Sequence, residues 1–103
     1  MTETVISVNG IAIRLTDERW AHITEEHSEL AGMRFEVLET IVQPWRIYEG
    51  ADEECLAIRE IEIGKFLVAV YRETDADGCV ITAFLTRRIK SLEKRNLLWS
   101  QPK

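Results

Sequence analysis

The chain has 103 residues, of which 46% are hydrophobic and 30% are charged. This length suffices for one hydrophobic core but not for two, so we expect a single domain over residues 1–103. The regular mixture of apolar and polar positions argues against disorder and fibrous repeats, and the longest apolar runs are strand-sized, too short to span a membrane. No basic segment followed by a hydrophobic one opens the chain, so we expect a cytoplasmic protein without a membrane partner.

The formal net charge is −5, which by itself argues against a nucleic-acid partner. The charge is unevenly distributed, however, because residues 86–103 hold six basic side chains and one acid, leaving −10 on the other 85 residues. A positive end on an acidic body fits an anionic site, a short RNA segment or an acidic partner. A solvated C-terminal helix explains the same pattern, and charge alone favours that simpler explanation.

The first half of the chain predicts a β-hairpin and two helices. Residues 5–15 alternate in polarity around Asn9-Gly10, which predicts the hairpin and a two-residue turn. Thr16 is suited to cap a helix, and apolar spacing predicts that this helix runs from about Asp17 to Leu30. Residues 33–43 form a second amphipathic segment that ends at Pro44. The side chains expected to point inward are Phe35, Leu38, Ile41 and Val42.

After Pro44 the apolar pattern changes to a period of two, which is typical of strands. Strand-like segments are WRIYEG (45–50), CLAIREIEI (55–63), KFLVAVYRE (65–73) and CVITAFLT (79–86), and RIKSLEKRNLL (88–98) is expected to be a short helix. Short turn-forming segments separate the last three strands, so we expect them to pair as consecutive hairpins. The predicted fold class is α+β: an N-terminal β-hairpin, two α-helices, a four-stranded antiparallel meander and a short C-terminal helix.

The candidate site is one face of this meander. Pairing across the loop TDADG places Arg72, Thr82 and Thr86 on the same face. If Ile61 also pairs with Phe66, Arg59 lies beside Val68 on that face. The predicted convergent set is Arg59, Arg72, Thr82 and Thr86. Guanidinium groups and hydroxyls together can bind a phosphate. The opposite face is purely apolar and is where we expect the helices: Leu56, Ile58, Leu67, Ala69, Ile81, Ala83 and Leu85.

His22 and His27 are the only histidines, and imidazole is the side chain that titrates near neutral pH. His27 falls within the apolar stripe of the first helix, so it is either a proton-transfer group or a core histidine that donates to a backbone carbonyl. His22 is turned toward Glu18 and Glu26. It is either a proton-transfer group or an exposed residue in contact with Glu26 one turn away.

Other side chains are interpreted as core. Cys55 and Cys79 lie in strand-like runs without zinc-site spacing, so we expect small buried hydrophobes rather than ligands or nucleophiles. Trp20, Trp45 and Trp99 are expected in the core, although they could stack on bases.

Five motifs resemble one nuclease superfamily when they are taken together and in order. They are RWAHITEEHSEL, IVQPWRIYEG, CLAIREI, GKFLVAVYRE and VITAFLTRRI, and together they cover the chain from about Leu15 to Ile89. In this combination the sequence resembles the small phage- and plasmid-associated branch of the BECR superfamily, which includes barnase, EndoU, colicin and RelE-type nucleases. The resemblance implies two helices packed against a four-stranded antiparallel sheet.

The resemblance also implies a function and a set of site residues. Such enzymes cleave RNA without metal or another cofactor, by attack of the ribose 2′-hydroxyl on the adjacent phosphate. The implied catalytic residues are His22 or His27 for proton transfer, Arg59 for charge stabilisation and Thr82 for holding the phosphate. The substrate-binding residues that we expect are Lys65, Arg72, Thr86, Arg87 and Arg88.

RNA is therefore the expected partner, together with an antitoxin or immunity protein as regulator. The same fold could instead serve as a non-catalytic module that binds RNA or protein. A third alternative is an accessory protein that oligomerises, for example as a homodimer, because an open sheet leaves unpaired edges.

Overall fold

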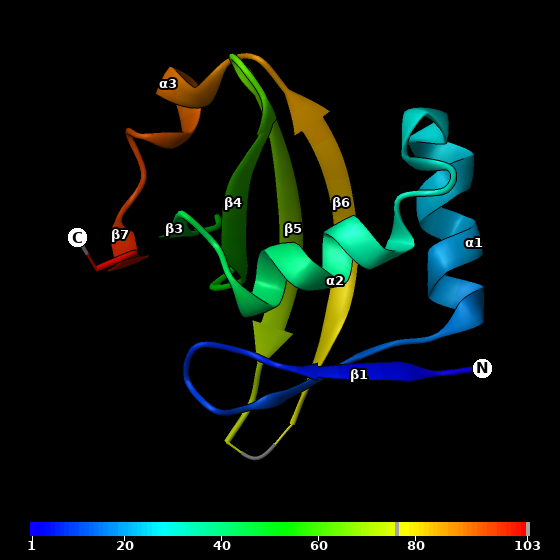
Figure 1. Cartoon of the computed structure of the whole chain (residues 1–103). Coiled ribbons are helices and arrows are strands. Elements are labelled where there is room, and N and C mark those ends of the chain that lie inside the picture. The colour runs from blue at the N-terminus through cyan, green and yellow to red at the C-terminus, as the bar shows by residue number, and fades with distance from the viewer. Residues whose placement is uncertain (76, 103) are drawn as a thin grey trace.

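A computed structural model describes residues 1–75 and 77–102 and confirms the α+β class. The strands form one mixed seven-stranded sheet in the order β1-β2-β6-β5-β4-β3-β7. The strands are β1 (Glu3–Ile6), β2 (Ala12–Leu15), β3 (Arg46–Glu49), β4 (Cys55–Glu62), β5 (Lys65–Glu73), β6 (Gly78–Thr86) and β7 (Leu97–Ser100). The helices are α1 (Asp17–Glu26), the 3-10 turn η1 (Ser28–Leu30), α2 (Arg34–Val42) and α3 (Ile89–Leu92), as Figure 1 shows. None of the described helices is long and apolar enough to cross a membrane.

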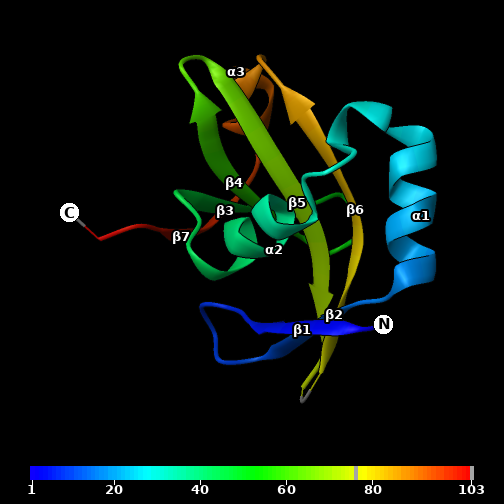
Figure 2. The ribbon, with the colours of Figure 1, turned by 45° about the vertical axis from the view of Figure 1, so that its right-hand side comes forward.

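The two long helices take different positions on the sheet. α2 lies across one face, in contact with β4 and β5, whereas α1 stands beside the edge formed by β6 (Figures 1 and 2). β2 pairs in parallel with β6 only at Gly78 and Cys79, so the rest of β6 has no strand on that side. α1 occupies this edge, and it can therefore bring a histidine close to β6.

The main core lies between the helices and the sheet, and a smaller cluster lies on the other face under α3. Fully buried members of the main core include Ile13, Leu15, Ile23, Leu30, Val37, Ile41, Leu67 and Tyr71. Leu92 of α3 packs with Tyr48, Ile58 and Val68 in the smaller cluster. Each large apolar side chain buried in this way contributes roughly 2 kcal/mol to folding.

α1 begins as predicted and ends earlier. The Thr16 side chain accepts a hydrogen bond from the backbone N–H of Arg19 at 3.0 Å, which is an N-cap. The helix stops because His27 leaves the helical conformation, with φ −131° and ψ 72°. The following 3-10 turn then carries Leu30 into the core, where it is fully buried.

α2 buries a different stripe from the predicted one. Leu38 and Ile41 point inward as expected, but Phe35 is 68% exposed and Val42 is 41% exposed. Thr40 is buried instead, and its hydroxyl donates to the carbonyl oxygen of Glu36 at 2.7 Å, so that its polar atom is satisfied. Two exposed apolar side chains therefore remain on the outer surface of α2.

The register of β4 differs from the prediction by one residue. Glu62 pairs with Lys65 and Glu60 pairs with Phe66, so Ile61 is the extra residue of an irregularity in β4. Arg59 consequently pairs with Leu67 and lies on the helix-covered face. The predicted location of Arg59 was wrong, and Leu56 and Ile58 likewise lie on the face opposite to the expected one.

The pairing of β5 with β6 is largely as predicted. Val70 lies opposite Thr82, and Phe66 lies opposite Thr86. An irregularity at Ile81 then shifts the register, so Arg72 pairs with Cys79 rather than with Val80.

Three further expectations are corrected. Cys55 is buried but Cys79 is exposed, because Cys79 lies on the outer face of the sheet near the start of β6. The first hairpin closes through residues 7–11 rather than through a two-residue turn, since Ile6 pairs with Ala12. The predicted C-terminal helix is reduced to α3, and the last part of that segment enters β7 beside β3.

Candidate functional site

The predicted convergence of four polar residues on one sheet face does not occur. Arg59 lies on the helix side, where its guanidinium forms an ion pair with Glu39 of α2. Thr82 lies on the opposite face, next to Val70. Arg72 is at the far end of β5 from Lys65, a separation of roughly 23 Å for seven strand residues. A single phosphate therefore cannot contact all four residues.

Arg72 is also engaged elsewhere. Its Nη2 atom lies 3.1 Å from a carboxylate oxygen of Asp52 and 3.1 Å from the carbonyl oxygen of the same residue. This pair fastens the connection between β3 and β4 to the end of β5. Arg72 consequently has a structural role in this conformation.

The structure gathers a different subset of the predicted residues at the opposite end of the sheet. A hollow of about 250 Å³ lies where η1, the start of β5 and the end of β6 meet, and we call it the rim hollow. Its lining consists of Glu29, Lys65, Leu85, Thr86 and Arg87. Two cations and one carboxylate thus face a space large enough for a small anion.

The cations of the rim hollow are held differently. Lys65 is about one-third exposed, and its Nζ atom lies 3.9 Å from Glu62. Arg87 is exposed, and its Nη1 atom lies close to the turn at Gly64, 4.0 Å from where a Cβ atom would stand. Gly64 has φ +75°, so the tight turn that brings Lys65 next to Arg87 favours glycine.

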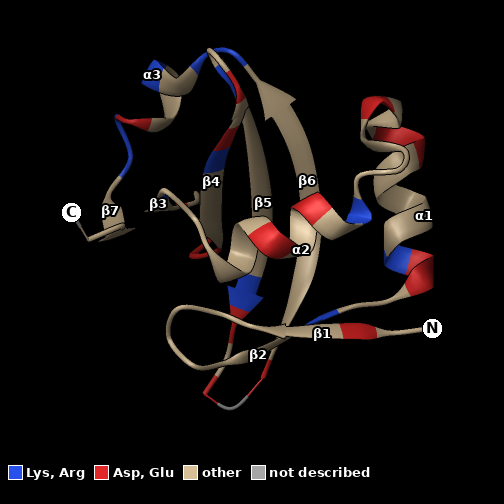
Figure 3. Cartoon of the chain, viewed as in Figure 1, with Lys and Arg blue, Asp and Glu red and all other residues tan. Residues whose placement is uncertain are grey.

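Thr86 shapes the backbone at this site. Its Oγ1 atom accepts a hydrogen bond from the backbone N–H of Arg88 at 3.0 Å, which turns the chain out of β6. The basic residues that follow β6 are exposed along this turn and α3, and Figure 3 shows them as blue segments at the top of the view. Within residues 1–75 and 77–102, no ion pair involves Arg87, Arg88 or Lys90.

His27 stands next to the rim hollow. Its side chain is 33% exposed, and its Nδ1 atom lies 3.8 Å from a carboxylate oxygen of Glu29, which lines the hollow. On its other side the imidazole lies against Phe84, with ring centroids 6.3 Å apart. The interpretation of His27 as a buried core histidine is therefore wrong, because one third of its side chain is exposed beside the hollow.

His22 lies away from this group. Its side chain is 57% exposed, and its Nε2 atom is 3.4 Å from Glu26, one turn further along α1. This arrangement confirms the simpler of the two interpretations of His22. A shallow hollow next to it is lined by Thr16, Glu18 and Arg19.

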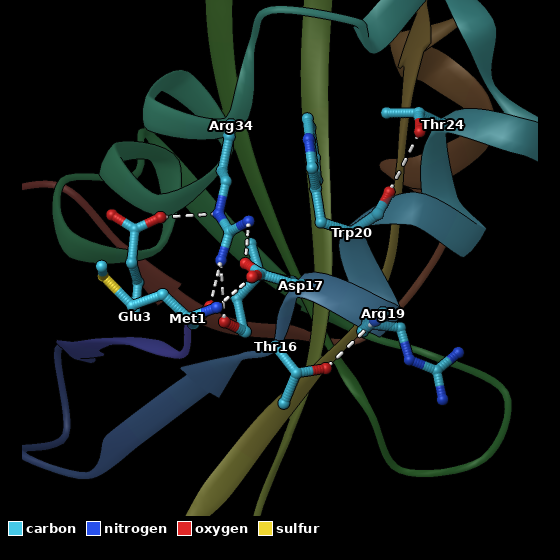
Figure 4. A network of polar contacts seen from close by, with 9 residues as sticks. Met1, Glu3, Thr16, Asp17, Arg19, Trp20, Thr24 and Arg34 are labelled. Atoms are coloured by element: carbon cyan, nitrogen blue, oxygen red, sulfur yellow. Dashed lines mark hydrogen bonds and ion pairs between the residues drawn. The ribbon is translucent and has the colours of Figure 1, made fainter.

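An ion-pair network fixes α1 and α2, the helices on either side of the segment that carries His27 and Glu29. Arg34, at the start of α2, lies 2.6 Å from Glu3 and 2.9 Å from Asp17, and it donates to the carbonyl oxygen of Leu15 at 3.1 Å (Figure 4). The N-terminal amine also pairs with Asp17. Hydrogen bonds from this amine and from Arg34 lower the pKa of the Asp17 carboxyl. The network joins β1, α1 and α2 on either side of the segment with His27.

Cys55 and Tyr71 are two further side chains whose pKa is shifted from its ordinary value. They are cross-strand neighbours in the main core, and burial raises both the pKa of the Cys55 thiol and the pKa of the Tyr71 hydroxyl. Both groups therefore remain protonated at neutral pH. This is consistent with core roles and excludes Cys55 as an activated nucleophile in this conformation.

The structure thus brings together Lys65, Thr86 and Arg87, with His27 alongside and Arg88 on the adjoining turn. It leaves Arg59, Arg72, Thr82 and His22 outside this group. The sequence analysis missed Glu29. In a continuous helix, residues two apart point in different directions, so His27 and Glu29 meet only because α1 stops at Glu26.

No family model, no curated protein and no solved structure matches this chain.

Proposed function

We propose that this protein is a metal-independent endoribonuclease of the BECR type, with the scissile phosphate bound in the rim hollow. One observation carries the proposal: a partly exposed imidazole lies 3.8 Å from the carboxylate of Glu29, in a site where that carboxylate faces Lys65 and Arg87. Proton transfer and anion stabilisation are the two functions that RNA cleavage by the 2′-hydroxyl requires. The motif resemblance to BECR nucleases supports the same reaction.

The chemistry assigns a role to each group. His27 and Glu29 form the acid–base pair: one removes the proton from the 2′-hydroxyl, and the other protonates the departing 5′-oxygen. Lys65 and Arg87 hold the non-bridging phosphate oxygens as negative charge accumulates on the phosphorane. Removing one such donor costs on the order of 10²- to 10³-fold in rate.

The surroundings of the rim hollow favour a restricted substrate. Exposed arginine and lysine side chains on the turn and on α3 attract a phosphodiester strand, whereas the rest of the protein is acidic. Generic RNA affinity is therefore low, and single-stranded segments that place one phosphate in the hollow are preferred. An acidic antitoxin or immunity protein that covers α3 would compete with RNA. β1 and β7 are the edge strands of the sheet, and a strand of a partner protein or of a second copy of this chain would pair there.

A second candidate function is a non-catalytic RNA-binding module on the same fold. The observation that favours it is the pairing of Arg59 with Glu39 on the helix face, which leaves no guanidinium from β4 near Thr82. In this alternative the rim hollow binds a phosphate without cleaving the strand.

Incubation of the purified full chain with total RNA in the presence of EDTA tests the proposal. We expect cleavage that yields 2′,3′-cyclic phosphate and 5′-hydroxyl ends, and we expect Lys65→Ala and Arg87→Ala each to slow it by about 100-fold. Lys94→Ala is the matched control, since Lys94 is exposed and lies outside the lining of the hollow. Intact RNA with a folded wild-type protein that still binds RNA through Lys65 would establish the binding module instead.

A further inference from the structure

A second and larger hollow, of about 800 Å³, lies where α2 ends and β3 begins. β3 pairs with β4 only as far as Ile58, whose carbonyl oxygen accepts from the backbone N–H of Trp45 at 2.8 Å. Beyond that point the edge of β4 is open. The lining residues that matter here are Gln43, Trp45, Arg59, Glu60, Trp99 and Gln101, and we call this space the edge hollow.

The aromatic walls of the edge hollow are of two kinds. Trp45 stacks with Phe66, with ring centroids 5.9 Å apart, and also contacts the guanidinium of Arg46, 4.1 Å from the indole centroid. Trp99 is half-buried, and no other ring stacks on it within the described part of the chain. Trp45 therefore supplies a rigid wall, and Trp99 supplies a ring that a flat ligand can contact.

The charges of the edge hollow discriminate against a phosphate. Arg59 is already paired with Glu39, and the carboxylate of Glu60 adds a further negative charge to the lining. The lining of the edge hollow therefore offers a phosphate no unpaired cation, in contrast to the rim hollow, where Arg87 has no carboxylate partner among the described residues.

The polar groups that remain suit the edge of a nucleobase. The carboxamides of Gln43 and Gln101 are exposed, and each can donate and accept at the same time. A carboxamide pairs with adjacent donor and acceptor atoms of a base, and aromatic side chains and guanidinium planes contact its face. A volume of this size is within the range of small-molecule sites.

We propose that the edge hollow is a nucleobase-binding subsite for a nucleotide that flanks the scissile phosphate. This inference rests on the proposed ribonuclease function. Leu85 of the rim hollow pairs with Leu67, and Leu67 pairs with Arg59 of the edge hollow, so the backbones of Leu85 and Arg59 are two strand spacings apart, or roughly 10 Å. Lys65, which lines the rim hollow, is on β5, the strand between β4 and β6. A short single strand of RNA anchored in the rim hollow is therefore long enough to place a base in the edge hollow.

Two-dimensional NMR titration of the full chain tests this subsite without requiring cleavage. The probes are adenosine, guanosine, cytidine, uridine and inorganic phosphate, and the signals are the side-chain amides of Gln43 and Gln101 and the indole N–H of Trp99. At least one nucleoside should shift these signals saturably, and phosphate should not. The double variant Gln43→Ala/Gln101→Ala should bind that nucleoside about tenfold more weakly. It should also cleave RNA with a smaller difference in rate between bases.

Asn96→Ala is the matched control, because Asn96 is an exposed amide outside the edge hollow. If the double variant cleaves RNA with unchanged base preference and binds the nucleoside with unchanged affinity, the subsite is overturned. The ribonuclease proposal is then unaffected. Nucleoside binding at these signals without RNA cleavage supports the subsite and overturns the ribonuclease proposal. Shifts caused by phosphate but by no nucleoside overturn the subsite.

Discussion

The two ends of the sheet use their arginines in opposite ways. At the hairpin end, where β1, β2 and the turn between β5 and β6 lie, arginines are bound to carboxylates: Arg14 to Asp77, Arg34 to Glu3 and Asp17, and Arg72 to Asp52. At the α3 end, where β5 begins and β6 ends, Arg87 and Arg88 are in no ion pair within the described residues. Figure 3 shows both ends in one view.

This difference separates structural cations from those that can bind a ligand. A guanidinium that already contacts a carboxylate and backbone carbonyls has few donors left, and moving it breaks contacts between elements. An unpaired guanidinium on the surface contributes little to stability and is available to phosphate. Residue type alone therefore does not identify the site; what separates Arg87 from Arg14, Arg34 and Arg72 is that it has no carboxylate partner among the described residues.

The largest expected effect is on catalysis at the α3 end. His27→Gln should lower the rate of RNA cleavage at least about 100-fold, because the acid–base pair with Glu29 is lost. His22→Gln, on the same helix but outside the rim hollow, should leave the rate within about twofold and is the matched control. Single-turnover cleavage of a short RNA measures both. Equal losses in the two variants would contradict the assignment of His27.

The next effect is on stability, where we expect a substitution at the hairpin end to cost more than one at the α3 end. Arg34→Ala should lower the free energy of unfolding by about 2 kcal/mol, since its side chain is only 22% exposed and joins β1, α1 and the end of β2. Arg87→Ala should change it by less than about 0.5 kcal/mol. Urea denaturation followed by circular dichroism measures both values. A larger loss in Arg87→Ala would mean that the α3 end is also structural.

A smaller effect concerns the salt dependence of RNA binding. Arg87→Ala should reduce the slope of log K against log salt concentration by about 0.7 for a single strand, because one phosphate contact is lost. Arg72→Ala should leave this slope unchanged, as its guanidinium is bound to Asp52. Fluorescence anisotropy with a labelled oligoribonucleotide at several salt concentrations gives the slopes. Equal reductions in both variants would remove the distinction between the two ends.

The sequence predicted elements better than it predicted registers. Alternating polarity and apolar spacing located β4, β5, β6, α1 and α2, because both periods follow directly from backbone geometry. The register of β4 failed at Ile61, where partial burial against the main core favours one extra residue in the strand. That choice depends on packing between distant segments. A shift of one residue moved Arg59 to the other face of the sheet.

The candidate site was predicted in part for the same reason. Lys65, Thr86 and Arg87 lie next to one hairpin turn, and a reading of local sequence finds them. Glu29 depends on the point at which α1 stops, and that point depends on the burial of Leu30. Helix ends that are set by tertiary packing are not encoded in a local pattern.

The smallest expected effect is the pH dependence that Asp17 gives the hairpin end. Hydrogen bonds from the N-terminal amine and from Arg34 lower the pKa of this carboxyl below its ordinary value of 3.8. The folded state therefore binds this proton less readily than the unfolded state does. The resulting stabilisation is fully present above about pH 5 and is lost as the pH falls through the lowered pKa. Wild type and Asp17→Asn should accordingly differ in Tm at pH 6 and converge toward pH 2, as measured by thermal unfolding. Glu25→Gln, an exposed carboxylate on the same helix, should show a smaller difference. A Tm difference that stays constant across this range would show that Asp17 acts through packing rather than through its charge.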